Sequence, residues 1–145
     1  MNKWDNRFLE LAYFIANWSK DPKRHVGCVI VDTDRNIIST GYNGFPRDVK
    51  DDERLFQVEV KLKIIVHAEA NAIANAARNG HALLERRLYV SRPVCSQCAG
   101  LIIQSGIGWV CYPAGIVGRE ESKWSKDWEI ALGVMAEGGV QAYEI

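Results

Sequence analysis

The sequence lacks an excess of either charge, because 18 Lys and Arg residues balance 18 Asp and Glu residues. A protein that binds long nucleic acid usually carries a strong positive excess, so we expect no nucleic-acid partner and a small-molecule substrate. No stretch approaches the roughly 20 apolar residues that a membrane span needs, and residues 1–10 carry charges where a signal peptide has an apolar core. We therefore expect a cytoplasmic protein with no membrane partner.

Cysteine and histidine are also scarce, with four cysteines and three histidines in the chain. Two of the cysteines form the segment Cys95-Ser96-Gln97-Cys98. In a reducing compartment this spacing favours metal binding over a disulfide. Cys28 and Cys111 lie inside apolar runs, and we predict that both are buried core residues.

Internal repeats and low-complexity segments are absent too, and 145 residues suffice for one hydrophobic core, so we predict a single domain over residues 1–145. Region 41–55 has no periodicity and is typical of a long functional loop, after which the pattern becomes helical. The predicted helices cover residues 4–18, 67–79, 95–105 and 121–137, and the predicted strands cover 26–31, 37–42, 87–91, 107–112 and 140–145. Strands joined through helices favour an α/β fold whose sheet is covered on both faces.

Two short motifs open two of the predicted helices: His67-Ala68-Glu69 and Cys95-x-x-Cys98. Residues two apart in a helix point about 200° away from each other, so His67 and Glu69 face one metal ion only at the first turn. Cys95 and Cys98 share one helical face, and the positive end of the helix dipole favours their thiolate form. The sequence therefore predicts that two helix N-termini converge on one metal ion.

This set of donor atoms favours zinc in a catalytic site. Two thiolates and one imidazole are ligands that Zn²⁺ prefers, and they leave the fourth tetrahedral position to water. The ion acidifies that water, and Glu69 is placed to accept the proton. The predicted metal ligands are thus His67, Cys95 and Cys98, and the predicted catalytic residue is Glu69.

Each motif alone has a simpler interpretation. A histidine at a helix start is usually a capping or surface residue, and a lone Cys-x-x-Cys also occurs in redox pairs and structural zinc sites. A closed structural site needs a fourth ligand, but the remaining histidines, His25 and His81, belong to no paired motif. Found together at two helix starts with Glu69, the motifs favour the catalytic interpretation.

The same motifs resemble those of the cytidine and deoxycytidylate deaminase superfamily, whose pattern is His-x-Glu with Pro-Cys-x-x-Cys. Here Pro93 lies one residue early and Val94 precedes Cys95, so we expect a small change of loop shape with the ligands retained. The resemblance is closest to the deoxycytidylate (dCMP) deaminase branch. It is carried by Ser19-Lys20-Asp21-Pro22, Val26-Gly27-Cys28-Val29-Ile30-Val31, Gly41-Tyr42-Asn43-Gly44-Phe45-Pro46, Asp51-Asp52, His67-Ala68-Glu69-Ala70-Asn71-Ala72-Ile73 and Cys95-Ser96-Gln97-Cys98-Ala99.

The resemblance implies a three-layer α/β/α sandwich with a mixed five-stranded sheet, as in cytidine deaminases. It also implies that the protein hydrolyses dCMP to dUMP and releases ammonia, and that the dUMP supplies thymidylate synthesis. The expected assembly is a homo-oligomer, either a hexamer or a dimer. Some members of the branch hold a second, structural zinc with Cys and His side chains from the loop before the catalytic histidine. Residues 43–66 contain neither, so we expect one Zn²⁺ per chain.

The resemblance also implies several substrate contacts. Asn43 matches an asparagine that hydrogen-bonds the sugar, although asparagine near glycine is also a common turn residue. The backbone amide of Ala68 matches a contact with the pyrimidine carbonyl, and Val26 is a further expected substrate contact. The chain departs from the branch after Tyr112, where a phosphate-binding pair is expected. The candidate phosphate ligands are therefore cations of the loops: Lys23, Arg24, Arg47 and Arg119.

Members of the branch respond to dCTP and dTTP through the loop that here contains Gly41, Tyr42 and Gly44, so we expect effectors there, accompanied by Mg²⁺. The helical spacing of Trp124 and Trp128 predicts core or subunit-interface residues and not base-stacking platforms.

Two other functions stay open. One is a deaminase of another substrate, either cytidine and deoxycytidine or a tRNA adenosine, and the balanced charge speaks against RNA. The other is a non-catalytic protein that senses dCTP or dTTP, and the presence of Glu69 speaks against it.

Overall fold

The computed structural model describes residues 2–117 and 124–145, so Arg119 lies outside the described residues. Five α-helices, one short 3-10 helix and five strands follow one another in this part of the chain. They are α1 (Lys3–Ala16), β1 (Gly27–Val31), β2 (Ile37–Tyr42), η1 (Glu53–Phe56), α2 (Val58–Ile64), α3 (Ala68–Arg78), β3 (Arg87–Val90), α4 (Ser96–Gln104), β4 (Trp109–Tyr112), α5 (Ser125–Glu137) and β5 (Gln141–Glu144). None of the described helices is long and apolar enough to cross a membrane.

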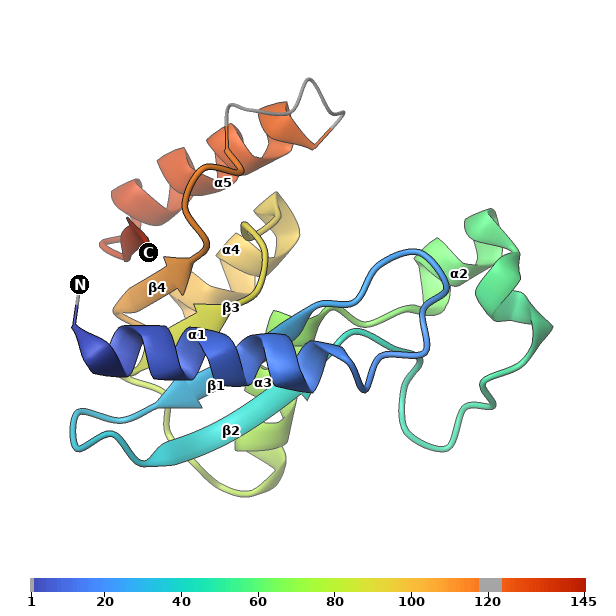
Figure 1. Ribbon diagram of the computed structural model, residues 1–145, viewed down its shortest axis with the longest axis horizontal. Coiled ribbons are helices and arrows are strands. Elements are labelled where there is room, and N and C mark those ends of the chain that lie inside the picture. The colour runs from blue at the N-terminus through green and yellow to red at the C-terminus, as the bar shows by residue number, and fades with distance from the viewer. Residues whose placement is uncertain (1, 118–123) are drawn as a thin grey trace.

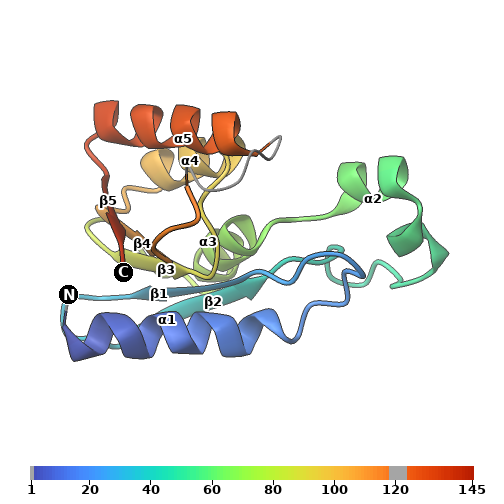
Figure 2. The same ribbon diagram turned by 45° about the horizontal axis from the view of Figure 1, so that its top comes forward.

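The strands form one mixed sheet in the order β2-β1-β3-β4-β5. Strand β1 pairs antiparallel with both β2 and β3, whereas β3, β4 and β5 run parallel. Helix α1 covers one face of the sheet, and α3, α4 and α5 cover the other face (Figures 1 and 2). The predicted α/β/α sandwich with a mixed five-stranded sheet is confirmed.

The core is divided between the two faces of the sheet, and β1 contributes to both. Its alternating side chains send Cys28 and Ile30 toward the side of α3, and Val29 and Val31 toward α1. All four are buried, as is Cys111 in β4. The prediction that Cys28 and Cys111 are buried core residues is confirmed.

The segment between β2 and α3 differs from the prediction, because η1 and α2 stand where the predicted order has no separate helix. Ile65 has extended dihedral angles (φ −62°, ψ 136°), and Val66 pairs with Gly44 in an isolated antiparallel bridge. Extended backbone at these two residues ends α2 and lets α3 begin anew at Ala68, with His67 as its N-cap. Helix α2 therefore stands away from the sheet (Figure 2).

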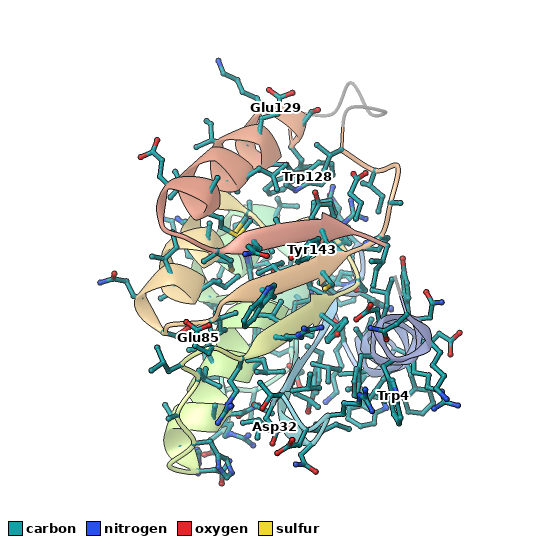
Figure 3. All side chains as sticks on the ribbon, turned by 90° about the vertical axis from the view of Figure 1, so that its left-hand side faces the viewer. Trp4, Asp32, Glu85, Trp128, Glu129 and Tyr143 are labelled. Atoms are coloured by element: carbon teal, nitrogen blue, oxygen red, sulfur yellow. The ribbon has the colours of Figure 1, made fainter. Side chains whose placement is uncertain are left out.

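Helix α5 packs against the face of the sheet that also carries α4. It begins at Ser125, and residues 118–123, which include the predicted start of this helix, lie outside the described residues. Figure 3 shows Trp128 on the side of α5 that faces the sheet and Glu129 on the outer side. Trp128 is buried, as predicted for a core residue, whereas Trp124 is half-buried.

The contact between β2 and α3 provides a test of the packing that positions α3. A Cβ atom on Gly41 would lie 2.3 Å from the carbonyl oxygen of Ala68 and 2.4 Å from the amide nitrogen of Ala72. Backbone atoms of a helix cannot move aside as a flexible side chain can. Gly41→Ala should therefore lower the free energy of unfolding by at least about 1–3 kcal/mol. Urea denaturation followed by circular dichroism measures this change.

Gly44→Ala is the matched control, since a Cβ atom there meets only a Tyr42 ring carbon at 3.9 Å. Its unfolding free energy should stay within about 0.5 kcal/mol of the parent protein. Equal destabilisation by the two variants would contradict the proposed role of Gly41.

Candidate metal centre

The N-termini of α3 and α4 meet at one edge of the sheet. Helix α3 has His67 as its N-cap and α4 has Cys95, and both residues have extended backbone (φ −70°, ψ 157° and φ −79°, ψ 163°). Neither side chain caps its own helix by a hydrogen bond, so the imidazole and the thiol remain for other partners. The predicted position of both motifs at the first helical turn is confirmed.

The side chains of His67, Cys95 and Cys98 converge on one point. The Nδ1 atom of His67 lies 3.4 Å from Sγ of Cys95 and 3.5 Å from Sγ of Cys98. Tetrahedral zinc, with Zn–S bonds of about 2.3 Å and Zn–N bonds of about 2.0 Å, would separate these donor atoms by about 3.5 Å. In the described part of the chain no further His, Cys, Asp or Glu joins the group. The three donors therefore fit a zinc ion with one open position.

The local electrostatics favour the ligand form of Cys95. A hydrogen bond from the thiol of Cys98, opposed by burial and supported by His67, lowers the pKa of Cys95 to about 4. The same bond raises the pKa of Cys98, and a hydrogen bond with Cys95 raises that of His67. The lowered pKa favours the thiolate form of Cys95, which is the form that binds a metal ion.

Glu69 lies beside this group and is 4% exposed. Burial, reinforced by the charge of Cys95, raises the pKa of Glu69 to about 7, although its own backbone N–H and the charge of His67 act in the opposite direction. A carboxyl group that titrates near neutrality can both accept and donate a proton during a reaction. The position and the electrostatics of Glu69 therefore suit proton transfer next to the metal group.

The metal group and Glu69 border a cavity of about 600 Å³. This volume is in the range of small-molecule sites. Five of the seven residues predicted to contact substrate line the same cavity: Lys23, Arg24, Val26, Asn43 and Ala68. The structure thus brings together the predicted metal ligands, the predicted proton shuttle and most of the predicted substrate contacts.

The other two phosphate candidates are not brought to this cavity. Arg47 is exposed and donates a hydrogen bond of 2.8 Å to Oδ1 of Asn75. Arg119 lies outside the described residues.

The three residues predicted to bind effectors do not line the cavity. Gly41 packs under α3, the exposed ring of Tyr42 meets the ring of Trp18 edge-on at 6.1 Å, and Gly44 pairs with Val66. An effector site in this loop stays a prediction.

Asn43 holds the wall of the cavity in place. Its Oδ1 atom accepts a hydrogen bond of 2.8 Å from the backbone N–H of Val26, and its Nδ2 group donates one of 2.9 Å to the carbonyl of Arg24. The carbonyl of Asn43 itself accepts a hydrogen bond from the hydroxyl of Ser19. Asn43 therefore holds in place the residues that lead into β1, including Arg24. The contact of Asn43 with a sugar stays a prediction.

A buried ion pair that the sequence did not indicate supports the same loop. Nζ of Lys61, from α2, lies 3.0 Å from Oδ1 of Asp21, and both side chains are about 5% exposed. Asp21 also accepts hydrogen bonds from the backbone N–H groups of Lys23 and Arg24. Although burial raises the pKa of Asp21, these two bonds and the bond from Lys61 together hold that pKa below its usual value. No periodicity or motif distinguishes such a lysine from a surface lysine, so sequence reasoning missed this pair.

Helix α5 and the loop after β3 form the opposite wall, through Arg92, Trp124, Asp127 and Trp128. The carboxylate of Asp127 accepts hydrogen bonds from the backbone N–H (2.9 Å) and the hydroxyl (2.6 Å) of Ser96, so α5 caps the first turn of α4. Sequence reasoning missed Arg92 and Asp127, and it assigned Trp124 and Trp128 to the core or a subunit interface and not to a cavity wall. The one available signal was the shifted Pro93, which directly follows Arg92.

Comparison with known proteins agrees with this geometry. Residues 2–114 match the family described as "Cytidine and deoxycytidylate deaminase zinc-binding region". A probable deoxycytidylate deaminase of Drosophila melanogaster is 42% identical over 120 residues, which cover 75% of this chain and 58% of the relative. This chain thus matches little more than half the length of that relative.

Two further comparisons extend over almost the whole chain. A protein of Aliivibrio fischeri named "Uncharacterized deaminase in luxG 3'region" is 35% identical over 143 residues, or 97% of this chain and 92% of the relative. The crystal structure of dCMP deaminase from the cyanophage S-TIM5 in complex with dCMP and dUMP has a TM-score of 0.81 at 20% identity, covering 100% of this chain and 99% of the other. At that identity the likeness shows a shared fold.

The metal ligands can be tested by substitution. We expect the parent protein to bind roughly one zinc per chain. Cys95→Ala or Cys98→Ala removes one of the three donors, so each purified variant should lose most of this zinc, because an open site cannot replace a missing ligand. Atomic emission spectroscopy after dialysis measures zinc content. Cys111→Ala, in a buried cysteine outside the group, should keep its zinc. A full zinc equivalent in either of the first two variants would reject the ligand set.

Proposed function

The chain belongs to the cytidine and deoxycytidylate deaminase family, and from this premise we propose that it is a zinc-dependent hydrolase that deaminates dCMP to dUMP. The observation that carries the proposal is the convergence of His67, Cys95 and Cys98 beside the buried carboxyl of Glu69, at a cavity that His67, Glu69 and Cys95 line. The choice of dCMP is supported by the relative named as a probable deoxycytidylate deaminase and by the fold shared with a phage enzyme that binds dCMP.

The three donors are assigned to one Zn²⁺ ion per chain. Bound there, zinc supplies the Lewis acidity that makes water nucleophilic at neutral pH. The protein contributes a donor set already close to tetrahedral spacing and a carboxyl group next to it. The homo-oligomer, and dCTP or dTTP effectors with Mg²⁺, stay predictions from the resemblance.

Glu69 moves the protons of the reaction. It accepts a proton from the attacking water as the oxygen of that water bonds to C4 of the cytosine ring. It passes this proton to ring N3, then takes the second proton from the new hydroxyl on C4 and delivers it to the amino group, so the C4–N bond breaks and ammonia leaves. Water thereby supplies the oxygen of the uracil product, and Glu69 returns to its starting state.

Three groups of the cavity orient the base and the sugar in this proposal. The backbone N–H of Ala68 meets the pyrimidine carbonyl, and Asn43 and Val26 border the sugar. Val58 and Leu62 of α2, with Ile65 directly after it, give this side of the cavity an apolar lining.

The substrate is tested by an ammonia-release assay on zinc-loaded protein with dCMP, deoxycytidine, dCTP and guanine in parallel. The proposed function predicts turnover of dCMP well above that of the other three compounds. Turnover of deoxycytidine without dCMP, or of none of the four, would reject dCMP as the substrate.

Glu69→Gln tests the proton shuttle. The amide keeps the size of the side chain but cannot carry a proton between water and the base, so kcat should fall by about 10²- to 10⁴-fold. Zinc content and dUMP affinity should stay near those of the parent protein. Glu129→Gln, on the outer side of α5 (Figure 3), is the control and should keep full activity. Near-normal kcat in Glu69→Gln would remove Glu69 from the mechanism.

A further inference from the structure

Asp127 joins helix α5 to the helix that carries the two cysteines. Its Oδ2 atom accepts a hydrogen bond of 2.9 Å from the backbone N–H of Ser96, and its Oδ1 atom accepts one of 2.6 Å from the hydroxyl of the same residue. Ser96 is the first residue of α4 and follows Cys95 directly. Both carboxylate oxygens therefore bind the residue next to a metal donor.

This contact fills a role that the side chain of Cys95 does not fill. The first N–H groups of an α-helix have no partner within the helix, and the N-cap side chain usually accepts one of them. Cys95 is the N-cap of α4, but its side chain makes no capping hydrogen bond and lies at His67 instead. A carboxylate from another helix takes this place, where the positive end of the helix dipole also favours it.

The packing of α5 on α4 fixes the position of Asp127. The two helices run side by side on the same face of the sheet (Figure 2). Near their C-terminal ends, a Cβ atom on Gly138 would lie 2.9 Å from Cδ1 of Ile103, so the helices are in close contact there as well. Between these two contacts, Ile102 and Met135 belong to one buried core. Asp127 is thus held by a helix that packs along the length of α4.

Asp127 is not itself one of the metal donors. Within residues 2–117 and 124–145, the group of donor atoms that lie within 4.8 Å of one another comes from His67, Cys95 and Cys98. Asp127 therefore acts on the metal group through Ser96. Loss of a hydrogen bond that orients a metal ligand from outside the coordination sphere typically lowers metal affinity by about 10- to 100-fold.

We propose that Asp127 is a positioning residue of the metal centre: it fixes the peptide between Cys95 and Ser96, and thereby the thiol of Cys95 and the affinity for zinc. The inference rests on the metal group of the proposed function and not on the choice of dCMP as substrate. Asp127 lies outside residues 2–114, which match the deaminase family, so membership of the family assigns it no role. Helix α5 then supports the metal centre as well as the cavity wall.

The affinity for zinc tests this proposal on the purified protein, by competition with a chelator of known affinity. Asp127→Ala removes both hydrogen bonds and should weaken zinc binding by about 10- to 100-fold. Asp127→Asn keeps the size of the side chain and one acceptor oxygen, so it should weaken zinc binding by a smaller factor. Ser96→Ala removes only the hydroxyl bond and should also have a smaller effect.

Two further measurements separate positioning from a loss of stability or of charge. In protein loaded with Co²⁺ in place of zinc, the visible absorption bands report the arrangement of the ligands, and Asp127→Ala should shift these bands. The double variant Ser96→Ala with Asp127→Ala should bind zinc as Asp127→Ala does. The hydroxyl has already lost its partner in the single variant, so the two effects should not add.

Asp32→Ala is the matched control. In the turn between β1 and β2, Asp32 accepts hydrogen bonds of 2.8 Å and 2.9 Å from the backbone N–H and the side chain of Asn36, and it does not line the cavity at the metal group. The zinc affinity and the cobalt spectrum of this variant should equal those of the parent protein.

Zinc binding as tight as that of the parent protein in Asp127→Ala and Ser96→Ala would overturn the proposal, because Asp127 would then serve only as a helix cap. Weaker zinc binding with an unchanged cobalt spectrum would overturn it as well, since the charge alone would then cause the effect. If Asp127→Ala does not fold, the same comparison of Asp127→Asn and Ser96→Ala with the parent protein decides.

The deamination of dCMP by the parent protein separates this proposal from the proposed function. Inactive parent protein whose zinc affinity and cobalt spectrum change in Asp127→Ala would reject the function and support the positioning role. Active parent protein whose zinc affinity is unchanged in Asp127→Ala would support the function and overturn the positioning role.

Discussion

The site depends on one constraint of the sheet: the segments that carry the metal donors must leave it at the same edge. Strands β2 and β3 both pair antiparallel with β1, so they run in the same direction and end at the same edge. Helix α4 follows β3 directly. Helix α3 is brought to this edge by the bridge between Gly44 and Val66, which ties the residue before His67 to the end of β2. This bridge and the close packing of α3 over Gly41 together bring His67 to the cysteines.

The same edge separates charge within the cavity. Two helix N-termini, with their positive dipole ends, lie next to the thiolate of Cys95 and the carboxyl of Glu69 and reduce the cost of burying them. On the side of α5, Arg24 and Arg92 carry positive charge over tryptophan rings. Net charge, which is zero for the whole chain, gives no indication of it.

The fold class and the metal group could be predicted because both depend on short-range rules. Burial on both faces of β1 appears in the sequence as a continuous apolar run, and glycines end the two metal helices at residues 80 and 106. The spacing of His67 to Glu69 and of Cys95 to Cys98 is useful to a metal only at a first turn, and the structure has both motifs there. The helical pattern after residue 55 was predicted, but its division into α2 and α3 was not, because the bridge at Val66, a contact between residues distant in the sequence, decides where α2 ends.

The wall formed by α5 could not be predicted for a different physical reason. Periodicity tells which side of a helix faces inward, but it does not tell whether the inward side meets core or cavity. Trp128 satisfies both descriptions: it is buried against the sheet, and it also lies under a charged side chain that lines the cavity. A cation–π contact has no sequence spacing of its own when its partners come from different elements. In the sequence, only the position of Pro93, one residue earlier than in the family pattern, indicated a difference in this loop. The burial of Val94 in the core, which the structure shows, accounts for the position of Arg92 at the cavity wall.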